Sequence, residues 1–169
     1  MNHLQLNEYQ RYALDKLSIT SLIPMQEAAL HTAREAKEVI LLSPTGTGKT
    51  LAYLLPLIER LREGDASVQA LVIVPSRELA LQIEQVVKTM RLPWKAMSVY
   101  GGRPAMDEHR TMRGLQPNII IGTPGRLNDH LEKGNIDAVT ITTLIIDEFD
   151  KCLEPVSYTH LTLPTTWPV

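Results

Sequence analysis

A glycine-rich stretch at residues 43–50 contains the residue types that bind a phosphate. It reads SPTGTGKT. Gly46 and Gly48 permit backbone angles that a β-carbon would forbid, so main-chain N–H groups can approach an anion closely. A helix that begins here would add its positive amino-terminal end. Lys49 can reach the β- and γ-phosphates of a nucleotide, and the Thr50 hydroxyl can bind Mg²⁺.

The stretch departs from the strict phosphate-loop pattern at its first position, where Ser43 stands in place of glycine. An ordinary glycine-rich turn between a strand and a helix is the alternative interpretation. It is disfavoured because the apolar run VILLS lies only two residues before GTGKT, as in a strand–loop–helix phosphate site. The expected nucleotide-binding residues of this loop are Ser43, Pro44, Thr45, Gly46, Thr47, Gly48, Lys49 and Thr50.

A pair of carboxylates follows a second apolar run. Residues 143–150 read TLIIDEFD, so a buried strand would end at Asp147 and Glu148. Asp147 suits Mg²⁺, and Glu148 suits the role of base for an attacking water. A solvated acidic turn is the alternative, and it is disfavoured once this strand shares a sheet with a phosphate loop. The two elements predict nucleoside-triphosphate hydrolysis, with Lys49, Asp147 and Glu148 as catalytic residues and Thr50 and Asp147 as metal ligands.

The order of apolar runs and helical patterns predicts the fold class. Five short, β-branched runs indicate strands buried on both faces, at 38–43, 70–75, 95–100, 118–122 and 143–147. Helical patterns lie between them, near 49–63, 77–91, 104–115 and 125–133. This alternation predicts an α/β domain with a mostly parallel central sheet between two helical layers. Ligands of such sheets gather at the carboxyl ends of the strands.

Composition restricts the function classes. The formal net charge of the 169 residues is −2, so a nucleic-acid site would have to be a local basic patch. Cys152 is the single cysteine, which excludes an intrachain disulfide. The amino terminus lacks the pattern of a signal peptide, and no apolar run is long enough to cross a bilayer, so we expect a cytoplasmic protein without a membrane partner. Trp94 is expected to pack in the core, and the histidines, His130 among them, lack metal-ligand spacing.

Several short motifs resemble those of the DEAD-box RNA helicases, in that family's order and approximate spacing. They are SPTGTGKT at 43–50, PSRELA at 75–80, Gly101-Gly102, TPGR at 123–126 and DEFD at 147–150. SLIPMQ at 21–26 resembles the end of that family's adenine-reading Q motif, which would occupy the region 1–26. The resemblance covers residues 1–154. It implies a three-layer RecA-like domain of an ATP-dependent RNA helicase.

The resemblance also assigns roles to single residues. Gln26 would read the adenine edge, which gives preference for ATP over GTP. The RNA sugar-phosphate backbone would lie along Pro75, Arg77, Gly101, Gly102, Thr123, Pro124, Gly125 and Arg126. Glycines let a backbone approach phosphates, and arginines and threonines donate to them, so these contacts would be independent of base sequence. RNA would be distinguished from DNA through its 2′-hydroxyl.

The sequence departs from the family pattern in three places. Phe149 occupies the third position of DEFD, where the family usually has alanine. The aromatic residue that stacks on adenine upstream of the Q motif is absent. The family's Ser-Ala-Thr motif and its second RecA-like domain, which carries an arginine finger, do not follow. The Ser-Ala-Thr strand normally lies between the phosphate-loop strand and the strand that ends at Asp147, so we expect an incomplete sheet with a gap there.

The last fifteen residues differ in composition from the rest. Residues 155–169 contain three prolines, four threonines and no Asp, Glu, Lys or Arg. PVSYTHLTLPTT resembles a translation of the transposon-end adaptor used in sequencing libraries. We therefore expect the native domain to end near residue 154 and the tail to be non-native. The alternative is a genuine Thr/Pro-rich extension.

Two other functions compete with the RNA helicase. A related superfamily-2 DNA helicase or translocase is disfavoured by Gln26 together with PSRELA and TPGR. A non-catalytic nucleic-acid-binding fragment is the second alternative, and ATPase activity measured with and without RNA would separate it from an enzyme. GTPases are disfavoured because the sequence has no Asn-Lys-x-Asp guanine motif.

Overall fold

The computed structural model describes residues 5–44, 46–102 and 104–152. Its elements in chain order are α1 (Glu8–Lys16), α2 (Pro24–Glu35), α3 (Lys49–Arg60), β1 (Ala70–Ile73), α4 (Arg77–Met90), β2 (Ala96–Val99), α5 (Ala105–Leu115), β3 (Ile119–Gly122), α6 (Pro124–Glu132), a 3₁₀ turn η1 (Ala138–Thr140), β4 (Thr143–Ile146) and α7 (Phe149–Cys152). The predicted tail and its boundary at residue 154 lie outside the described residues.

The four strands form one parallel sheet in the order β2-β3-β1-β4. The register pairs Ala70 with both Ile119 and Thr143, so the strands begin nearly level with one another. Because all four strands run the same way, their carboxyl ends lie together at one end of the sheet, which we call its carboxyl edge. The lateral edges of the sheet are the outer strands β2 and β4.

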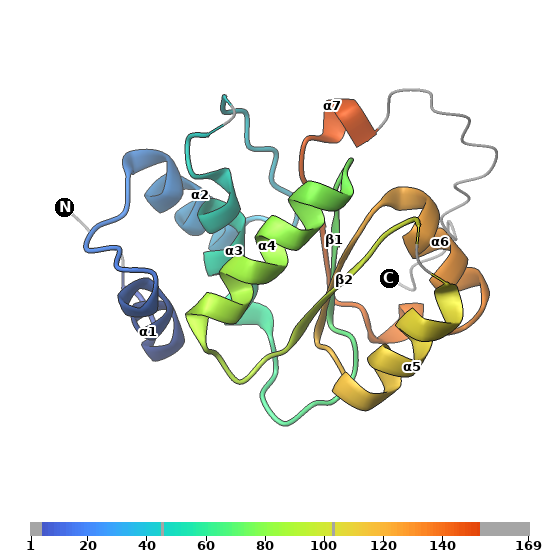
Figure 1. The fold of residues 1–169 in the computed structure, drawn as a ribbon. Helices are drawn as coiled ribbons and strands as arrows, with labels where there is room; N and C mark the ends of the chain where they lie inside the picture. Colours follow the sequence, from blue (N-terminus) through green and yellow to red (C-terminus); the bar gives the residue numbers. More distant parts are fainter. Residues whose placement is uncertain (1–4, 45, 103, 153–169) are drawn as a thin grey trace.

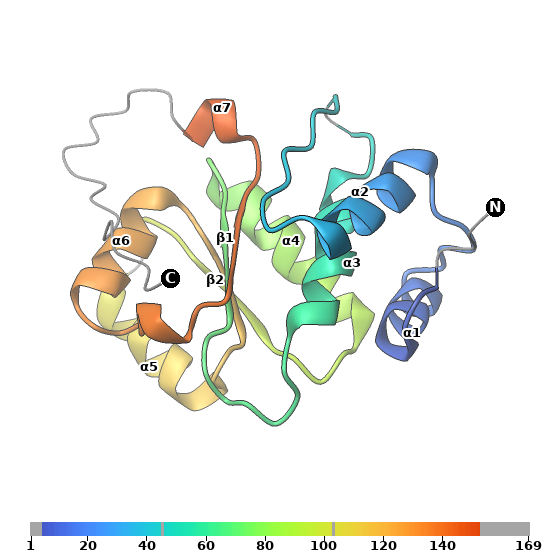
Figure 2. The ribbon, with the colours of Figure 1, turned by 180° about the vertical axis from the view of Figure 1, so that it is seen from behind.

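Helices cover both faces of the sheet (Figures 1 and 2). Alternate strand residues such as Val72 and Ile121 pack in a core with α1–α4. Their neighbours Leu71 and Ile120 pack on the opposite face in a core with α5 and α6. This arrangement confirms the predicted α/β fold with two helical layers, and the four long predicted helices form within three residues of their expected bounds.

The predicted strand at 38–43 is wrong for this structure: these residues form no strand. Among the described residues β4 pairs only with β1, so the other edge of β4 is open. Ile40 is 88% exposed and Leu42 is 90% exposed, although both are apolar. An apolar, β-branched pattern cannot form a strand without a hydrogen-bonding neighbour. The open edge agrees with the gap expected beside the strand that ends at Asp147.

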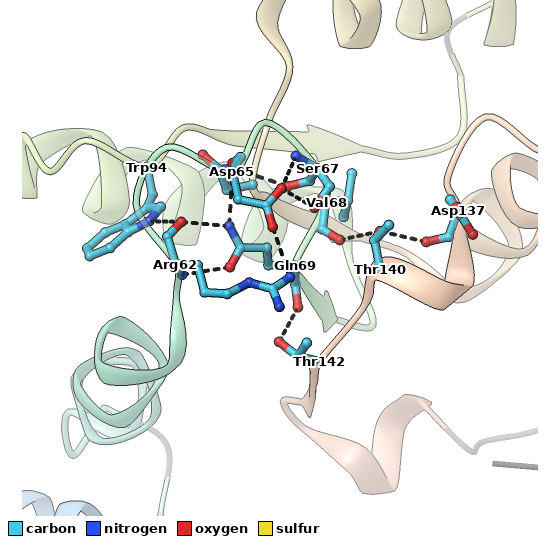
Figure 3. A network of polar contacts seen from close by, with 10 residues as sticks. Arg62, Asp65, Ser67, Val68, Gln69, Trp94, Asp137, Thr140 and Thr142 are labelled. Atoms are coloured by element: carbon cyan, nitrogen blue, oxygen red, sulfur yellow. Dashed lines mark hydrogen bonds and ion pairs between the residues drawn. The ribbon is translucent and has the colours of Figure 1, made fainter. Parts of the chain in front are cut away.

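A polar network fixes the amino-terminal end of the sheet (Figure 3). The Gln69 side chain donates to the Arg62 carbonyl over 2.9 Å and accepts from the Arg62 N–H over 2.7 Å. Trp94 Nε1 donates to the same carbonyl over 3.1 Å, and the Thr142 hydroxyl donates to the Gln69 carbonyl over 3.2 Å. Trp94 is buried, as predicted. These bonds satisfy polar groups where the loops enter the amino-terminal end of the sheet.

Replacement of Ile40 by lysine should reduce aggregation of the 169-residue chain. The side chain is almost fully exposed on an unpaired apolar segment beside an open sheet edge, and a charge there opposes pairing with another chain. Static light scattering and the monomer fraction on gel filtration measure the effect. Ile58→Lys in the buried face of α3 is the control, and it should unfold the domain because it buries an unpaired charge. Equal scattering by the wild type and Ile40→Lys would show that this segment does not drive association.

Candidate nucleotide and nucleic-acid site

The sheet brings the sequence motifs together at its carboxyl edge. Pro75 follows β1, Gly101 follows β2, Thr123 follows β3 and Asp147 follows β4. The residues predicted to contact nucleic acid therefore share an edge with the predicted carboxylates. This convergence is a consequence of parallel pairing, since motifs placed after strands are collected at one end.

The phosphate loop has the backbone that its glycines predict. Gly46 and Gly48 have φ angles of 79° and 88°, and Gly48 is the left-handed cap of α3. Lys49 Nζ donates to the Ser43 carbonyl over 2.9 Å, and the Thr47 hydroxyl donates to the Pro44 carbonyl over 2.8 Å. The lysine thus reaches back across the loop to where a phosphate would be held. Thr45 lies outside the described residues.

Gln26 joins α2 to the phosphate loop. Its Nε2 donates to the Gly48 carbonyl over 3.2 Å, and its Oε1 accepts from the Ile23 N–H over 3.2 Å. A β-carbon on Gly48 would lie 2.7 Å from this Nε2. The hydrogen bond to Gly48 indicates that Gln26 supports the phosphate loop. This adds to the adenine-reading role that the resemblance implies for Gln26.

A tyrosine links the two halves of the predicted metal site, and sequence reasoning missed it. The Tyr53 hydroxyl donates to Asp147 Oδ2 over 3.1 Å, which connects α3, the helix that carries Thr50, to the residue after β4. Burial, with the Asp147 carboxylate nearby, raises the pKa of Tyr53 well above its usual value, so the hydroxyl keeps its proton. The available signal was the position of Tyr53, one helical turn after Thr50 and on the same face of α3.

The donors around Tyr53 fit Mg²⁺. Thr50 and Asp147 offer oxygen ligands, and Asp147 Oδ1 also accepts from the Glu148 N–H over 2.9 Å. This small set of oxygen atoms suits Mg²⁺, which is usually bound through one or two protein carboxylates together with water and substrate phosphates.

The residues after Asp147 form the short helix α7. Glu148 has a φ of 48°, and its carboxylate pairs with Lys151 over 2.9 Å. Cys152 is buried, and its thiol donates to the Asp147 carbonyl over 3.3 Å. Burial raises the pKa of Cys152 to about 11, so the thiol is uncharged at neutral pH. The Phe149 side chain is 60% exposed.

Arg77 and the two glycines have accessible positions on the predicted nucleic-acid surface. The Arg77 side chain is largely exposed, and its guanidinium lies 5.4 Å from the centre of the Tyr100 ring. Gly101 and Gly102 are exposed, and Gly102 has a φ of 94°. A side chain at Gly102 would be strained whatever the space around it.

The Arg126 side chain is mostly buried and contacts other protein groups, although the resemblance implies that it contacts RNA. Its side chain is 14% exposed, and its Nε lies 3.3 Å from both the Tyr100 carbonyl and Glu108 Oε2. Its Nη1 lies 3.5 Å from Asp129. Glu108 also contacts His130, which is fully buried and lies in a helix. The sequence did not predict a role for Glu108, because its partners lie in other elements and leave no local pattern in the sequence.

Known proteins share this fold and these motifs. A model of the DEAD/DEAH box helicase family matches residues 23–162. The chain belongs to this family. Curated relatives include the DEAD-box ATP-dependent RNA helicase CshA of Geobacillus kaustophilus, 34% identical over 158 residues, and that of Streptococcus pneumoniae, 38% identical over 154 residues. These alignments cover 89% and 90% of this chain but 32% and 29% of the relatives.

A solved structure supports the RecA-like fold. It is described as the DEAD-box helicase Mss116 bound to ssRNA and UDP-BeF, and it matches with a TM-score of 0.79 and 33% identity. The match covers 89% of this chain and 32% of that chain. The chain therefore spans about a third of the length of the relatives it matches. No helix among the described residues is both long and apolar enough to cross a membrane.

Tyr53→Phe should lower the melting temperature by about 2–5 °C, because one intramolecular hydrogen bond contributes about 1 kcal/mol. The change removes only the hydroxyl that donates to Asp147. Differential scanning fluorimetry measures it. Tyr12→Phe is the matched control, since Tyr12 is exposed and its ring contact with Lys16 survives the change. Equal melting of Tyr53→Phe and the wild type would show that the link carries no stability.

Proposed function

We propose that this chain is the ATP-binding part of an ATP-dependent RNA helicase, which binds Mg²⁺·ATP and the RNA backbone at the carboxyl edge of its sheet. The observation that carries the proposal is the hydrogen bond from Tyr53, which lies one turn after Thr50 in the phosphate-loop helix, to Asp147. It ties the helix that carries Thr50 to the carboxylate that follows β4. An ordinary glycine-rich turn beside a solvated acidic turn would not need that connection.

Each residue would have a defined task in hydrolysis. Lys49 would leave the Ser43 carbonyl and hold the β- and γ-phosphates. Thr50 and Asp147 would hold Mg²⁺, which neutralises the charge that develops on the phosphates. Glu148 would orient a water and accept its proton. The ion pair of Glu148 with Lys151 is partly exposed and therefore weak, so it can open.

RNA would bind along the loops that follow β1, β2 and β3. Arg77 would donate to phosphates, and the exposed Gly101-Gly102 backbone would lie against the sugar-phosphate chain. Thr123 would add its hydroxyl at the start of α6, whose amino-terminal end favours an anion. Comparison of ATPase stimulation by RNA and by DNA of the same sequence would test this, and equal stimulation would favour the DNA-translocase alternative.

Unwinding would need more than these residues. The matched relatives are about three times as long, and the resemblance places the arginine finger in a second domain. We propose that the longer polypeptide acts on RNA in the cytoplasm, and that the 169-residue chain binds ATP and RNA without unwinding.

Gln26→Ala should lower the ratio of ATP to GTP affinity. The Gln26 amide can complement the amino group and ring nitrogen of adenine, and it also supports Gly48. Loss of loop support would weaken both nucleotides equally, so the ratio isolates base reading. Titration with fluorescent ATP and GTP analogues measures it, with Gln85→Ala on the exposed face of α4 as the control. An unchanged ratio in Gln26→Ala would refute the assignment of base reading to Gln26.

The 169-residue chain should bind Mg²⁺·ATP weakly and show negligible RNA-stimulated turnover. An arginine finger contributes roughly 10³–10⁵ in rate to comparable enzymes, and these residues supply none. A phosphate-release assay with and without single-stranded RNA measures turnover, with Lys49→Ala as the blank. Robust RNA-stimulated phosphate release that Lys49→Ala abolishes would contradict the expectation.

A further inference from the structure

We propose that Glu108 is a positioning residue that fixes the RNA-binding surface into one shape. The inference deepens the proposed function and rests on it for the identity of the ligand. Glu108 lies in α5, outside every motif that the sequence singled out, and is only 3% exposed. It cannot reach a bound phosphate, so any effect on RNA binding must pass through its neighbours.

Three elements meet at this carboxylate. Oε1 accepts from the Tyr100 N–H over 3.2 Å. Oε2 lies 3.3 Å from Arg126 Nε and 2.9 Å from His130 Nε2. Tyr100 belongs to the loop after β2, whereas Arg126 and His130 both lie in α6. One side chain of α5 therefore ties the Gly101-Gly102 loop to the TPGR helix.

Tyr100 extends the connection to the third predicted RNA-binding element. Its carbonyl accepts from Arg126 Nε over 3.3 Å, and its ring lies under the guanidinium of Arg77 from α4. The PSRELA, Gly-Gly and TPGR motifs thus converge on Tyr100, and Glu108 holds the backbone of that residue. The relative placement of the three motifs depends on this buried acid.

The negative charge of Glu108 distinguishes a positioning role from a purely electrostatic effect on RNA binding. Glu108 is negative, and RNA is a polyanion. If only charge mattered, removal of this carboxylate would tighten RNA binding. Positioning has the opposite consequence, because removal leaves the Tyr100 N–H, Arg126 and His130 without this buried acceptor and frees the loop to move.

The test measures binding of a fluorescein-labelled oligouridylate to the monomeric fraction of the full 169-residue chain. Glu108→Leu removes the hydrogen bonds and the charge. Glu108→Gln makes the same charge change but keeps polar oxygen and nitrogen atoms at the site. Glu132→Leu is the matched control, because Glu132 is an exposed residue of α6 with one hydrogen bond from Asn128. Hydrogen–deuterium exchange of the peptide that contains residues 99–102 is followed in parallel.

Glu108→Leu should bind the oligouridylate about tenfold more weakly than the wild type and exchange faster at residues 99–102. Glu108→Gln should stay within about threefold of the wild type, and Glu132→Leu should bind as tightly or more tightly. Binding by Glu108→Leu that equals or exceeds the wild type would overturn the inference.

Two further results remain decisive. If Glu108→Leu does not fold, Glu108→Asp keeps the charge and shortens the reach, and unchanged binding by that variant would overturn the inference while weaker binding supports it. If the wild type does not bind RNA, the proposed function fails. Hydrogen–deuterium exchange at residues 99–102 still tests whether Glu108 positions the loop. Faster exchange at residues 99–102 in Glu108→Leu but not in Glu132→Leu supports it, and equal exchange overturns it.

Discussion

Parallel pairing of β1 with β3 and β4, and of β3 with β2, is the constraint on which the rest of the structure depends. It sets the direction of four strands, so every loop that follows a strand emerges at one edge. Short polar motifs far apart in sequence become neighbours there without any direct attraction between them. At the other end a polar network joins the buried Gln69 side chain to the Arg62 backbone, where the loops enter the sheet.

Tyr53 and Tyr100 connect elements that meet at the carboxyl ends of the strands. The Tyr53 hydroxyl joins the phosphate-loop helix to the carboxylate of β4, and the Tyr100 backbone joins the loops of the nucleic-acid surface. Tyr100 is buried and Tyr53 is partly buried, and each connects elements that carry predicted site residues. The proposed nucleotide site and the proposed nucleic-acid surface therefore each depend on a tyrosine that joins two or more elements.

Much of this could be predicted from the sequence, because the signals are local. Four of the strands, the helices α3 to α6 and the glycine angles of the phosphate loop follow from apolar patterns and glycine placement, whereas α1 and α2 were not predicted. The segment 38–43 has the same apolar pattern but forms no strand, since β-structure depends on a neighbour that the pattern does not describe. The role of Glu108 and the burial of His130 were not predicted for a related reason. Their partners lie across element boundaries, and a buried acid in a polar helix resembles a surface residue until its surroundings are known.

We propose that Asp147 is a metal ligand that Tyr53 orients, and one measurement tests this most directly. Calorimetric titration of ATP in the presence and absence of Mg²⁺ would compare the wild type with Asp147→Asn. The asparagine keeps an oxygen for the Tyr53 hydroxyl but lacks the charge that attracts the metal. The account predicts that Mg²⁺ tightens ATP binding by about tenfold or more in the wild type, and that Asp147→Asn loses this gain while its Mg²⁺-free affinity stays the same. An equal gain from Mg²⁺ in both proteins would contradict it.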